Sequence, residues 1–373
     1  MAFPRTDTSL ISRWWWTVDR WTLAAVLMIA GIGIVLTMAA SPAVAERIGL
    51  DTFYFARRQS VYVPLALAVM FVTSLLSPKG VRRCCVIGCA IALALTIATL
   101  FVGPEVKGAT RWIRIGGLSL QPSEFLKPTF AVVSAWFICA SRQEQGFPGY
   151  FIATGLLMLC AAALLSQPDV GTTILIAGTW AVQIFLAGLP MILVVLVVLM
   201  FFGGALGAYF SFAHVRARVD HFLDPAVGEG YQIGRALEAF RSGGLFGRGP
   251  GEGRVKEQLP DAHADFIFAV AGEEFGLVVC LILVGLFAFV VLHGFGRALK
   301  DNNLFVVLAA TSLLAQFGMQ ALFNMASTTH LIPPKGTTLP FISYGGSATI
   351  ALAWTMGMVL ALTRQRPDSG GER

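Results

Sequence analysis

The stretch at residues 259–292 reads LPDAHADFIFAVAGEEFGLVVCLILVGLFAFVVL, and it passes from an acidic loop into a long apolar run. The run from 266 to 292 exceeds the roughly 20 apolar residues that a helix needs to cross a hydrocarbon core. Carboxylates are costly at such a boundary, so each acid placed there needs a functional or a structural reason. The stretch therefore predicts a membrane-spanning helix with acids at one edge.

The composition of the whole chain agrees with a membrane protein. Of its 373 residues 56% are hydrophobic and 13% are charged, and the mean hydropathy is +0.73. Soluble domains carry about a quarter charged residues. No cleaved signal peptide is expected, because Trp14, Trp15, Trp16 and Arg20 precede the first apolar run. The tryptophans suit either an interfacial anchor or a membrane-surface turn without a special role.

Ten apolar segments can be counted between turn-forming stretches. They lie at 21–40, 60–76, 86–102, 125–140, 150–165, 170–187, 191–212, 266–292, 304–326 and 344–362. The expected fold class is all-α: a polytopic membrane protein with about ten transmembrane helices and a long external loop, about 213–265, between helices 7 and 8. We expect one transmembrane domain over residues 1–373, with short tails at 1–20 and 363–373.

The charge distribution indicates the orientation of the chain and restricts its partners, whereas the cysteines do not indicate a compartment. Lys and Arg are more frequent in the short loops on the side of the two tails, so the positive-inside rule makes both tails cytoplasmic. The net charge of +6 is spread without a basic block. Nucleic acid is therefore not an expected partner, whereas anionic headgroups or a phosphate-bearing lipid substrate are. The six cysteines show no metal-type spacing and are expected to be small core residues.

The long external loop holds a helical pattern and a glycine-rich stretch. In GYQIGRALEAFRSGG (230–244) apolar residues recur on one face, which predicts a helix lying on the membrane surface or packed on neighbouring loops. The following residues, GGLFGRGPGEGRVKEQ (243–258), predict a mobile backbone. That backbone is either a linker or a flap over a large ligand, with Arg248, Arg254 and Lys256 facing phosphate.

Ionisable residues also occur at two helix starts. Glu124 and Lys127 in QPSEFLK (121–127) are three residues apart and share a helix face. Such a pair is either self-neutralising structure or part of a site, because ionisable groups inside a membrane are functional candidates. Asp169 in SQPDVG (166–171) is either an N-cap or a functional group.

A second external loop, THLIPPKGTTLPFISYGGSA (329–348), re-enters the membrane. Its prolines fix the backbone, and its paired glycines allow close approach. It is either a rigid wall of a cavity or a plain turn.

The acids of the opening stretch differ in position. Asp265 is the last polar residue before the apolar segment, so its carboxylate can stay ionised while it is partly desolvated. That position suits a general base. Asp265 is also placed to be the N-cap of the next helix. Asp261 is assigned to loop structure or a weak cation contact. Glu273 and Glu274 point about 100° apart and cannot both face one partner, and at least one should pair with a cation from another helix. His263 has no metal-binding pattern around it, which argues against a zinc hydrolase.

Four separated motifs together resemble the SEDS family of shape, elongation, division and sporulation proteins. They are QPSEFLK, SQPDVGT, the loop motif that ends in LPDAHADFIFAVAGEEFG, and PPKGTTLPFISYGGSA. The resemblance covers nearly the whole chain. The residues of the last two motifs favour the division member of the family over the elongation member. Ala264 and Ala348 replace a common threonine and a common serine of the family, and neither change removes a charge.

The resemblance implies a function. A family member of this kind is a glycosyltransferase of the bacterial inner membrane, enriched at the division septum, that polymerises lipid II into β-1,4-linked glycan strands. It works with a class B penicillin-binding protein, the septal transpeptidase, and with divisome regulators. The resemblance makes Asp265 the catalytic aspartate and maps substrate binding onto Glu124 and Lys127. An alternative is a transporter that flips the lipid-linked precursor; further alternatives are the elongation paralogue and a scaffold for the transpeptidase.

One carboxylate is sufficient for this chemistry. An undecaprenyl diphosphate leaves as a stabilised anion, so the site needs one base for the acceptor hydroxyl and cations near the phosphates. Beside the base Asp265, the expected substrate-binding residues are Lys127, Glu124, Arg248, Arg254, Lys256, His263, Lys335, Ser343 and Tyr344. No cofactor is certain, and the sequence leaves open whether a divalent cation, Mg²⁺ or Mn²⁺, assists.

Overall fold

The computed structural model describes residues 9–105, 109–115, 118–188, 230–333 and 336–365, together with isolated positions between 192 and 220. Most of the predicted segment at 191–212 lies outside the described residues, as do the extremes of both tails. Within the described part, the only strands belong to one small hairpin, and the remaining elements are helices.

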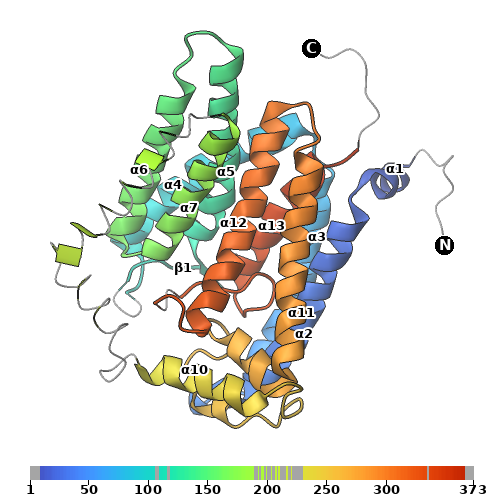
Figure 1. Cartoon of the computed structure of the whole chain (residues 1–373), viewed down its shortest axis with the longest axis vertical. Coiled ribbons are helices and arrows are strands. Elements are labelled where there is room, and N and C mark those ends of the chain that lie inside the picture. Colours follow the sequence, from blue (N-terminus) through green and yellow to red (C-terminus); the bar gives the residue numbers. More distant parts are fainter. Residues whose placement is uncertain are drawn as a thin grey trace.

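Long helices run side by side and form the body of the molecule (Figure 1). Nine of the ten predicted apolar segments coincide with a helix in the described part of the chain. These helices are α2 (Arg20–Arg47), α3 (Tyr54–Ser74), α4 (Pro78–Val102), α5 (Pro122–Gln143), α6 (Gly149–Ser166), α7 (Val170–Leu186), α11 (Ile267–Ala298), α12 (Leu304–Thr328) and α13 (Gly346–Leu362). By length and composition α2, α4, α6, α11 and α12 can each cross a membrane. The prediction of an all-α polytopic fold is confirmed.

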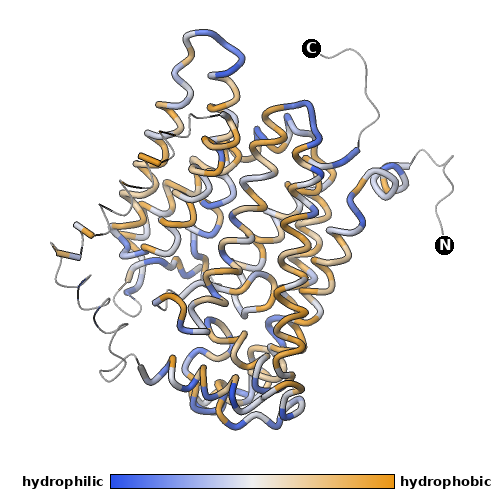
Figure 2. The backbone as a smooth tube through the Cα atoms, viewed as in Figure 1, coloured by the Kyte–Doolittle hydropathy of each residue, from blue (hydrophilic) through white to orange (hydrophobic). Residues whose placement is uncertain are grey.

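The bundle has two polar ends separated by a predominantly apolar middle (Figure 2). At one end α2 begins and α13 ends, and we call it the terminal end (Figure 1). At the other end lie α10 (Gly230–Gly243) and the short 3₁₀-helix η1 (Val255–Gln258), and we call it the loop end. The start of the first long helix and the finish of the last thus share one end, as an even number of crossings predicts.

The tryptophan cluster forms a short helix, α1 (Leu10–Thr17), at the terminal end. Trp14 is buried, its Nε1 donates to the Ser74 Oγ at 2.7 Å, and its ring meets Phe71 edge-on. Trp15 and Trp16 are exposed and lie against the Arg20 guanidinium. The sequence analysis assigned one role to all three tryptophans. In the structure Trp14 packs on α3, whereas Trp15 and Trp16 face outward.

The cysteines follow their prediction with one exception. Cys84 is exposed, whereas the other five are buried. The five buried thiols are Cys85, Cys89, Cys139, Cys160 and Cys280.

A two-stranded antiparallel hairpin lies between α4 and α5, and the sequence analysis missed it. Strand β1 (Ile113–Ile115) pairs with β2 (Leu118–Leu120), with Ile113 opposite Leu120. The signal was present, because WIRIGGLSL alternates apolar and polar residues around two consecutive glycines, which is a hairpin pattern. The hairpin delivers the chain to Pro122, the first residue of α5.

The helix predicted in the long loop exists as α10, and it crosses the start of α11. The Phe240 ring lies 5.6 Å from the Phe268 ring, edge to face. A Cβ atom on Gly272 would overlap the Phe240 ring, and one on Gly243 would overlap the Gly272 carbonyl oxygen, so these glycines allow the crossing. The apolar face of α10 therefore packs on a helix, whereas the sequence offered a loop or the membrane surface.

Helix α11 is interrupted at Gly276, where the backbone has φ of 77°. The glycine-rich stretch fills this interruption. Arg248 N donates to the Glu273 carbonyl at 3.0 Å, and Leu277 N donates to the Gly244 carbonyl at 3.0 Å. Backbone groups released by a broken membrane helix need such replacement partners. The predicted mobile linker or flap is thus wrong for residues 244–249, which are bonded to α11.

Candidate active site

Asp265 lies half-buried at the loop end, in the turn before α11. The N-cap of α11 is Phe266, and no side-chain hydrogen bond caps the helix, so the alternative of Asp265 as N-cap is wrong. A Cβ atom added to Gly336 would lie 3.5 Å from the Asp265 Oδ2 atom. The carboxylate therefore faces the loop at 336–345.

The main chain of Asp265 is fixed by helix α12. Asn324 Nδ2 donates to the Asp265 carbonyl oxygen at 2.9 Å and to the Thr337 carbonyl oxygen at 2.6 Å. Asn324 is buried, so these are bonds in a low-dielectric environment where losing a partner is costly. One amide thus holds the acid-bearing turn and the facing loop at a set separation.

The facing loop is also bonded directly to the residues before Asp265. The buried Ser343 Oγ donates to the Ala264 carbonyl at 2.7 Å and accepts from the Leu339 N–H at 2.7 Å. Tyr344 N donates to the His263 carbonyl at 2.9 Å. The structure therefore brings Ser343, Tyr344 and His263, three of the expected substrate-binding residues, close to Asp265. The Ser343 hydroxyl is already used in these internal bonds.

The rings of His263 and Tyr344 pack on helix α3. His263 stacks on Phe55 with centroids 4.0 Å apart, and Tyr344 meets the same ring edge-on at 4.9 Å. Burial raises the pKa of the Tyr344 hydroxyl, and its hydrogen bond with Arg58 opposes part of that rise. These contacts make an aromatic side wall next to the acid.

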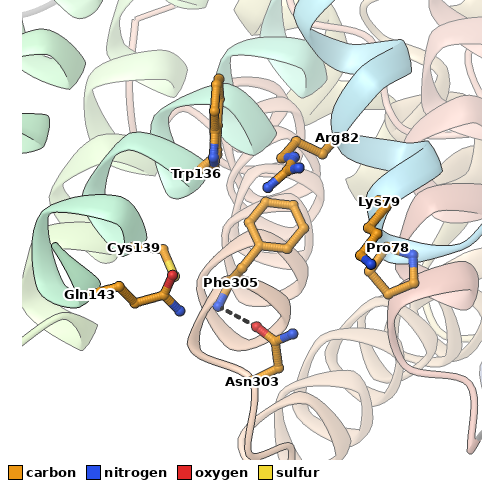
Figure 3. Close-up of a pocket in the computed structure, with 8 residues that line it drawn as sticks. All are labelled: Pro78, Lys79, Arg82, Trp136, Cys139, Gln143, Asn303 and Phe305. Atoms are coloured by element: carbon orange, nitrogen blue, oxygen red, sulfur yellow. Dashed lines mark hydrogen bonds between the residues drawn. The ribbon is translucent and has the colours of Figure 1, made fainter. Parts of the chain in front are cut away.

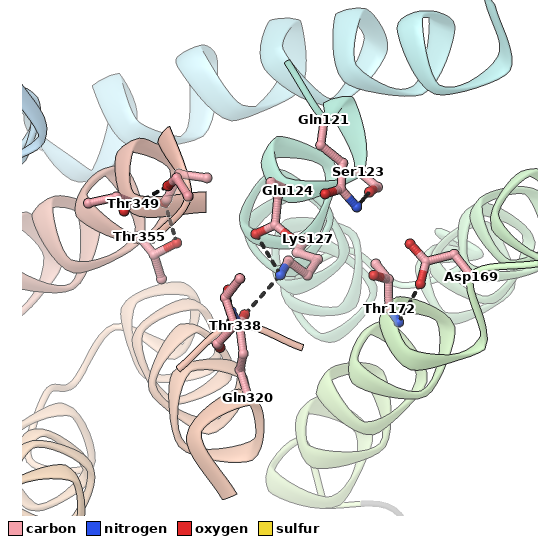
Figure 4. Close-up of polar contacts among 12 residues, drawn as sticks. Gln121, Ser123, Glu124, Lys127, Asp169, Thr172, Gln320, Thr338, Thr349 and Thr355 are labelled. Carbon is pink, nitrogen blue, oxygen red and sulfur yellow. Dashed lines mark hydrogen bonds and ion pairs between the residues drawn. The ribbon is translucent and has the colours of Figure 1, made fainter. Parts of the chain in front are cut away.

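Glu124 and Lys127 form a buried ion pair in the first turns of α5 (Figure 4). The Lys127 Nζ lies 2.9 Å from the Glu124 Oε2 and donates to the Gln320 Oε1 at 2.8 Å. Gln320 Nε2 in turn donates to the Thr338 carbonyl at 3.1 Å and to its hydroxyl at 3.0 Å. Through Gln320 the pair is connected to the same loop that faces Asp265.

A small cavity of about 10 Å³ borders this pair. It is lined by Glu124, Lys127, Pro128, Gln316, Phe317, Gln320, Ala351, Leu352 and Thr355. A space of this size holds at most one water molecule. A sugar or diphosphate can reach Lys127 only if these helices separate.

Lys256 does not stand with the exposed cations. It is buried, its ammonium pairs with the Glu274 carboxylate, and it also donates to the Ala39 carbonyl of α2 at 3.0 Å. Glu273 accepts from the Lys256 N–H at 2.9 Å and from the Val255 N–H at 2.7 Å. The expected pairing of one glutamate with a cation from another helix is confirmed. The expectation that both glutamates could not face one partner is wrong, because one meets the amide of Lys256 and the other its ammonium.

The remaining predicted cations fall into two groups. Arg248 and Arg254 are exposed at the loop end, and the Arg248 Nε donates to the Ser242 carbonyl at 3.3 Å. Lys335 lies outside the described residues.

Two other acids serve local structure. Asp169 is the N-cap of α7 and accepts from the Thr172 N–H at 3.2 Å, which confirms the capping alternative (Figure 4). Asp261 adopts φ of 51°, and its carbonyl accepts from the Ala264 N–H at 2.9 Å. Asp261 therefore shapes the turn that leads to Asp265, as the sequence analysis assigned it.

Sequence reasoning missed Gln320 and Asn324, which connect the site to α12. Together with Gln316 they recur every four residues inside an otherwise apolar segment. That spacing places three amides on one helix face, and polar residues in a membrane helix usually face the bundle interior. The pattern could have indicated both residues before the structure.

The described residues contain no group of three or more His, Cys, Asp or Glu side chains that could hold a metal ion. Among the described residues, these side chains therefore do not fit a metal held by the protein alone.

Comparisons with known proteins agree with this architecture. The family model described as cell cycle protein, for FtsW, RodA and SpoVE, matches residues 20–368. A Caulobacter vibrioides (strain NA1000 / CB15N) protein named probable peptidoglycan glycosyltransferase FtsW is 46% identical over 371 residues, covering 99% of this chain and 95% of its own. A Geobacter metallireducens protein of the same name is 34% identical, over 92% of this chain and 94% of its own.

Solved structures give the same result for the fold. A chain in a peptidoglycan synthase complex, described as coordinating polymerization and crosslinking, aligns with a TM-score of 0.77 at 26% identity, over 93% of this chain and 97% of the other. The rod shape determining protein RodA of Thermus thermophilus aligns with a TM-score of 0.68 at 26% identity, over 94% and 97% of the two chains.

Proposed function

Because the chain belongs to the FtsW/RodA/SpoVE family of cell cycle proteins, we propose that it is a peptidoglycan glycosyltransferase that polymerises lipid II. The observation that carries this proposal is the placement of Asp265. Its carboxylate is half-buried at the loop end and faces a loop, and Asn324 bonds its main chain to α12. A partly desolvated, rigidly placed carboxylate is suited to take a proton.

The proposed reaction is a single displacement. The 4-hydroxyl oxygen of the acceptor sugar attacks the anomeric carbon of the donor, while the bond from that carbon to the diphosphate oxygen breaks. Asp265 takes the hydroxyl proton, and the electron pair of the broken bond leaves with undecaprenyl diphosphate. In-line attack inverts the anomeric centre, so an α-linked donor yields a β-1,4 link.

The leaving diphosphate needs positive charge rather than a proton. Of the cations expected from the sequence, Arg248 and Arg254 are exposed at the loop end and we assign them to this role. We assign Lys256 to structure, because its ammonium is buried against Glu274. If a divalent cation such as Mg²⁺ or Mn²⁺ takes part, it would supply further positive charge to the departing diphosphate, because the described side chains form no metal site of their own.

The test is polymerisation of purified lipid II by the full chain in detergent, together with its transpeptidase partner. Asp265→Asn removes the base without changing size, so the rate should fall by a factor of about 10² to 10⁴. Asp261→Asn is the matched control, because it removes an acid four residues away in the same turn, and asparagine tolerates the positive φ there. It should retain most of the rate.

The outcomes are distinct. If the Asp265→Asn variant made glycan strands at the parental rate, Asp265 would not be the base. If both variants lost the same share of the rate, the loss would result from a disturbed turn and not from a missing base. Activity in detergent, where no sides exist, separates an enzyme from a transporter. EDTA followed by Mg²⁺ or Mn²⁺ decides whether a divalent cation takes part.

We extend the proposal to the cellular setting. The protein acts in the bacterial inner membrane with cytoplasmic termini, beside a class B penicillin-binding protein and divisome regulators at the septum. The likeness to a chain of a synthase complex supports the pairing with a crosslinking enzyme. Depletion should give filaments, whereas an elongation enzyme would give spheres.

A further inference from the structure

A cavity of about 170 Å³ opens at the terminal end, between α4, α5 and α12 (Figure 3). It lies at the end of the bundle opposite Asp265, so the proposed reaction does not use it. Its lining consists of Pro78, Lys79, Arg82, Trp136, Cys139, Gln143, Asn303 and Phe305.

The lining is positively charged. Lys79 and Arg82 are three residues apart on α4 and share a face. The Arg82 guanidinium lies 5.2 Å from the centre of the Trp136 ring, which orients it beside the cavity (Figure 3). Among the lining residues there is no Asp or Glu. Asp301 lies just outside the lining, and its carboxylate accepts from the Asn303 N–H at 2.8 Å.

Two helix starts add to this charge. Helix α4 begins at Pro78 and α12 begins at Leu304, so both present their positive ends next to the cavity. Asn303 caps α12 by accepting from the Phe305 N–H through Oδ1, and its amide nitrogen takes no part in that bond (Figure 3). The Gln143 amide reaches the cavity from α5.

The surroundings of this cavity suit a lipid headgroup. Val86 follows Lys79 and Arg82 on the same face of α4 and is exposed, as is its neighbour Ile87. An apolar, outward-facing surface thus continues from the cations toward the middle of the bundle. Basic pockets between membrane helices commonly bind phosphate-bearing headgroups, and tryptophan suits the same interfacial depth.

We propose that this pocket binds the phosphate group of an anionic phospholipid. Arg82 and Lys79 pair with the phosphate oxygens, the amides of Gln143 and Asn303 meet the ester and glycerol oxygens, and the acyl chains follow α4 past Val86. The bound lipid would bridge α4, α5 and α12.

Native mass spectrometry of the full chain in detergent, titrated with phosphatidylglycerol, tests the proposal. The double variant Lys79→Gln with Arg82→Gln should bind at least about ten-fold more weakly, because two charge-assisted contacts are lost. The matched control is Arg83→Gln with Arg142→Gln, which removes the same charge from exposed positions of α4 and α5 that do not line the cavity. At physiological ionic strength the control should bind like the parent.

Each other result overturns the proposal. Equal weakening in both double variants would indicate diffuse attraction, and unchanged binding in the Lys79/Arg82 variant would place the lipid elsewhere. Phosphatidylcholine binding as tightly as phosphatidylglycerol would remove the anionic specificity. Displacement of the lipid by millimolar inorganic phosphate would identify free phosphate as the ligand. If the double variant is not monodisperse, the single variant Lys79→Gln, at an exposed position, is used in its place.

Discussion

Glu124 and Lys127 are 9% and 4% exposed in their side chains, so each charge depends on the other. Removing one partner of such a buried pair costs about 3–5 kcal/mol, whereas removing both costs far less. We predict that Lys127→Met strongly lowers the thermal stability in detergent, and that adding Glu124→Gln restores most of it. Unfolding midpoints of the parent, the two single variants and the double variant measure this coupling.

The same variants test whether the pair also serves the substrate. Gln320 connects Lys127 to the loop that faces Asp265, so loss of the ammonium should raise the KM for lipid II about ten-fold even in the restabilised double variant. Parental kinetics in the double variant would restrict the pair to structure.

Single residues at this site were predictable to different degrees. Asp265 could be predicted because the sequence alone shows a carboxylate directly before a long apolar run, at the water–lipid boundary. Lys256 could not, because it stands with Arg248 and Arg254 in the sequence, and only the fold brings Glu274 to it. The spacing of Asn324 from Gln316 and Gln320 could have placed it on a polar helix face, but its bonds to the Asp265 and Thr337 carbonyls could not be predicted from the sequence.

At the scale of elements, the interruption of α11 determines how the loop end is assembled. Gly247 has φ of 81°, and a Cβ atom there would overlap the Glu274 carbonyl oxygen. Gly251 has φ of 85° with open space around the same position. Both substitutions by alanine therefore cost about 1 kcal/mol of backbone strain, but only Gly247→Ala also separates the stretch from α11.

We predict that Gly247→Ala destabilises by about 3 kcal/mol, because backbone bonds worth about 1 kcal/mol each are lost as well. Gly251→Ala, the control, should cost only the strain. Hydrogen exchange at Leu277 and Val278, whose amides bond to this stretch, should rise in the first variant alone. Equal exchange in the two proteins would contradict the assigned role of the contact.

The contact of η1 with α11 and α2 supplies another prediction. Glu274→Gln leaves the buried Lys256 ammonium without the carboxylate that balances its charge, so it should destabilise by about 3–5 kcal/mol. Adding Lys256→Met should recover much of this stability. Since neither residue meets the substrate in the proposed reaction, the double variant should keep the parental kcat. If the double variant recovered its stability but lost kcat, Lys256 would have to contribute to the substrate site.

Elements were predicted well where they are long and apolar, because membrane helices need a continuous apolar run. The hairpin at 113–120 was missed, although its alternation and paired glycines are visible in the sequence. The position of α10 could not be predicted, since an amphipathic face does not reveal what covers it. The structure shows that the cover is the start of α11, made accessible by Gly243 and Gly272.

On the scale of the whole molecule, the alternating helices place the proposed chemistry at the end opposite to the start of α2 and the finish of α13. At the terminal end the Arg364 Nε donates to the Thr17 Oγ1 at 3.0 Å, and Trp14 joins α1 to Ser74 at the end of α3. None of these residues approaches the turn that holds Asp265. Stability at one end and reaction rate at the other should therefore be separable by mutation.

Trp14 and Trp15 are adjacent and provide a matched test of that separation. Trp14→Ala removes a buried ring and its bond to Ser74, which should cost about 3–5 kcal/mol, whereas Trp15→Ala removes an exposed ring and should cost little. In the described part of the chain, α1 is connected to the loop end only through the long helices of the bundle. The folded fraction of Trp14→Ala should therefore polymerise lipid II at the parental rate. The measurement is the unfolding midpoint together with the rate per folded molecule at a temperature below both midpoints. A rate that falls with stability would show that helix packing at the terminal end sets the geometry around Asp265.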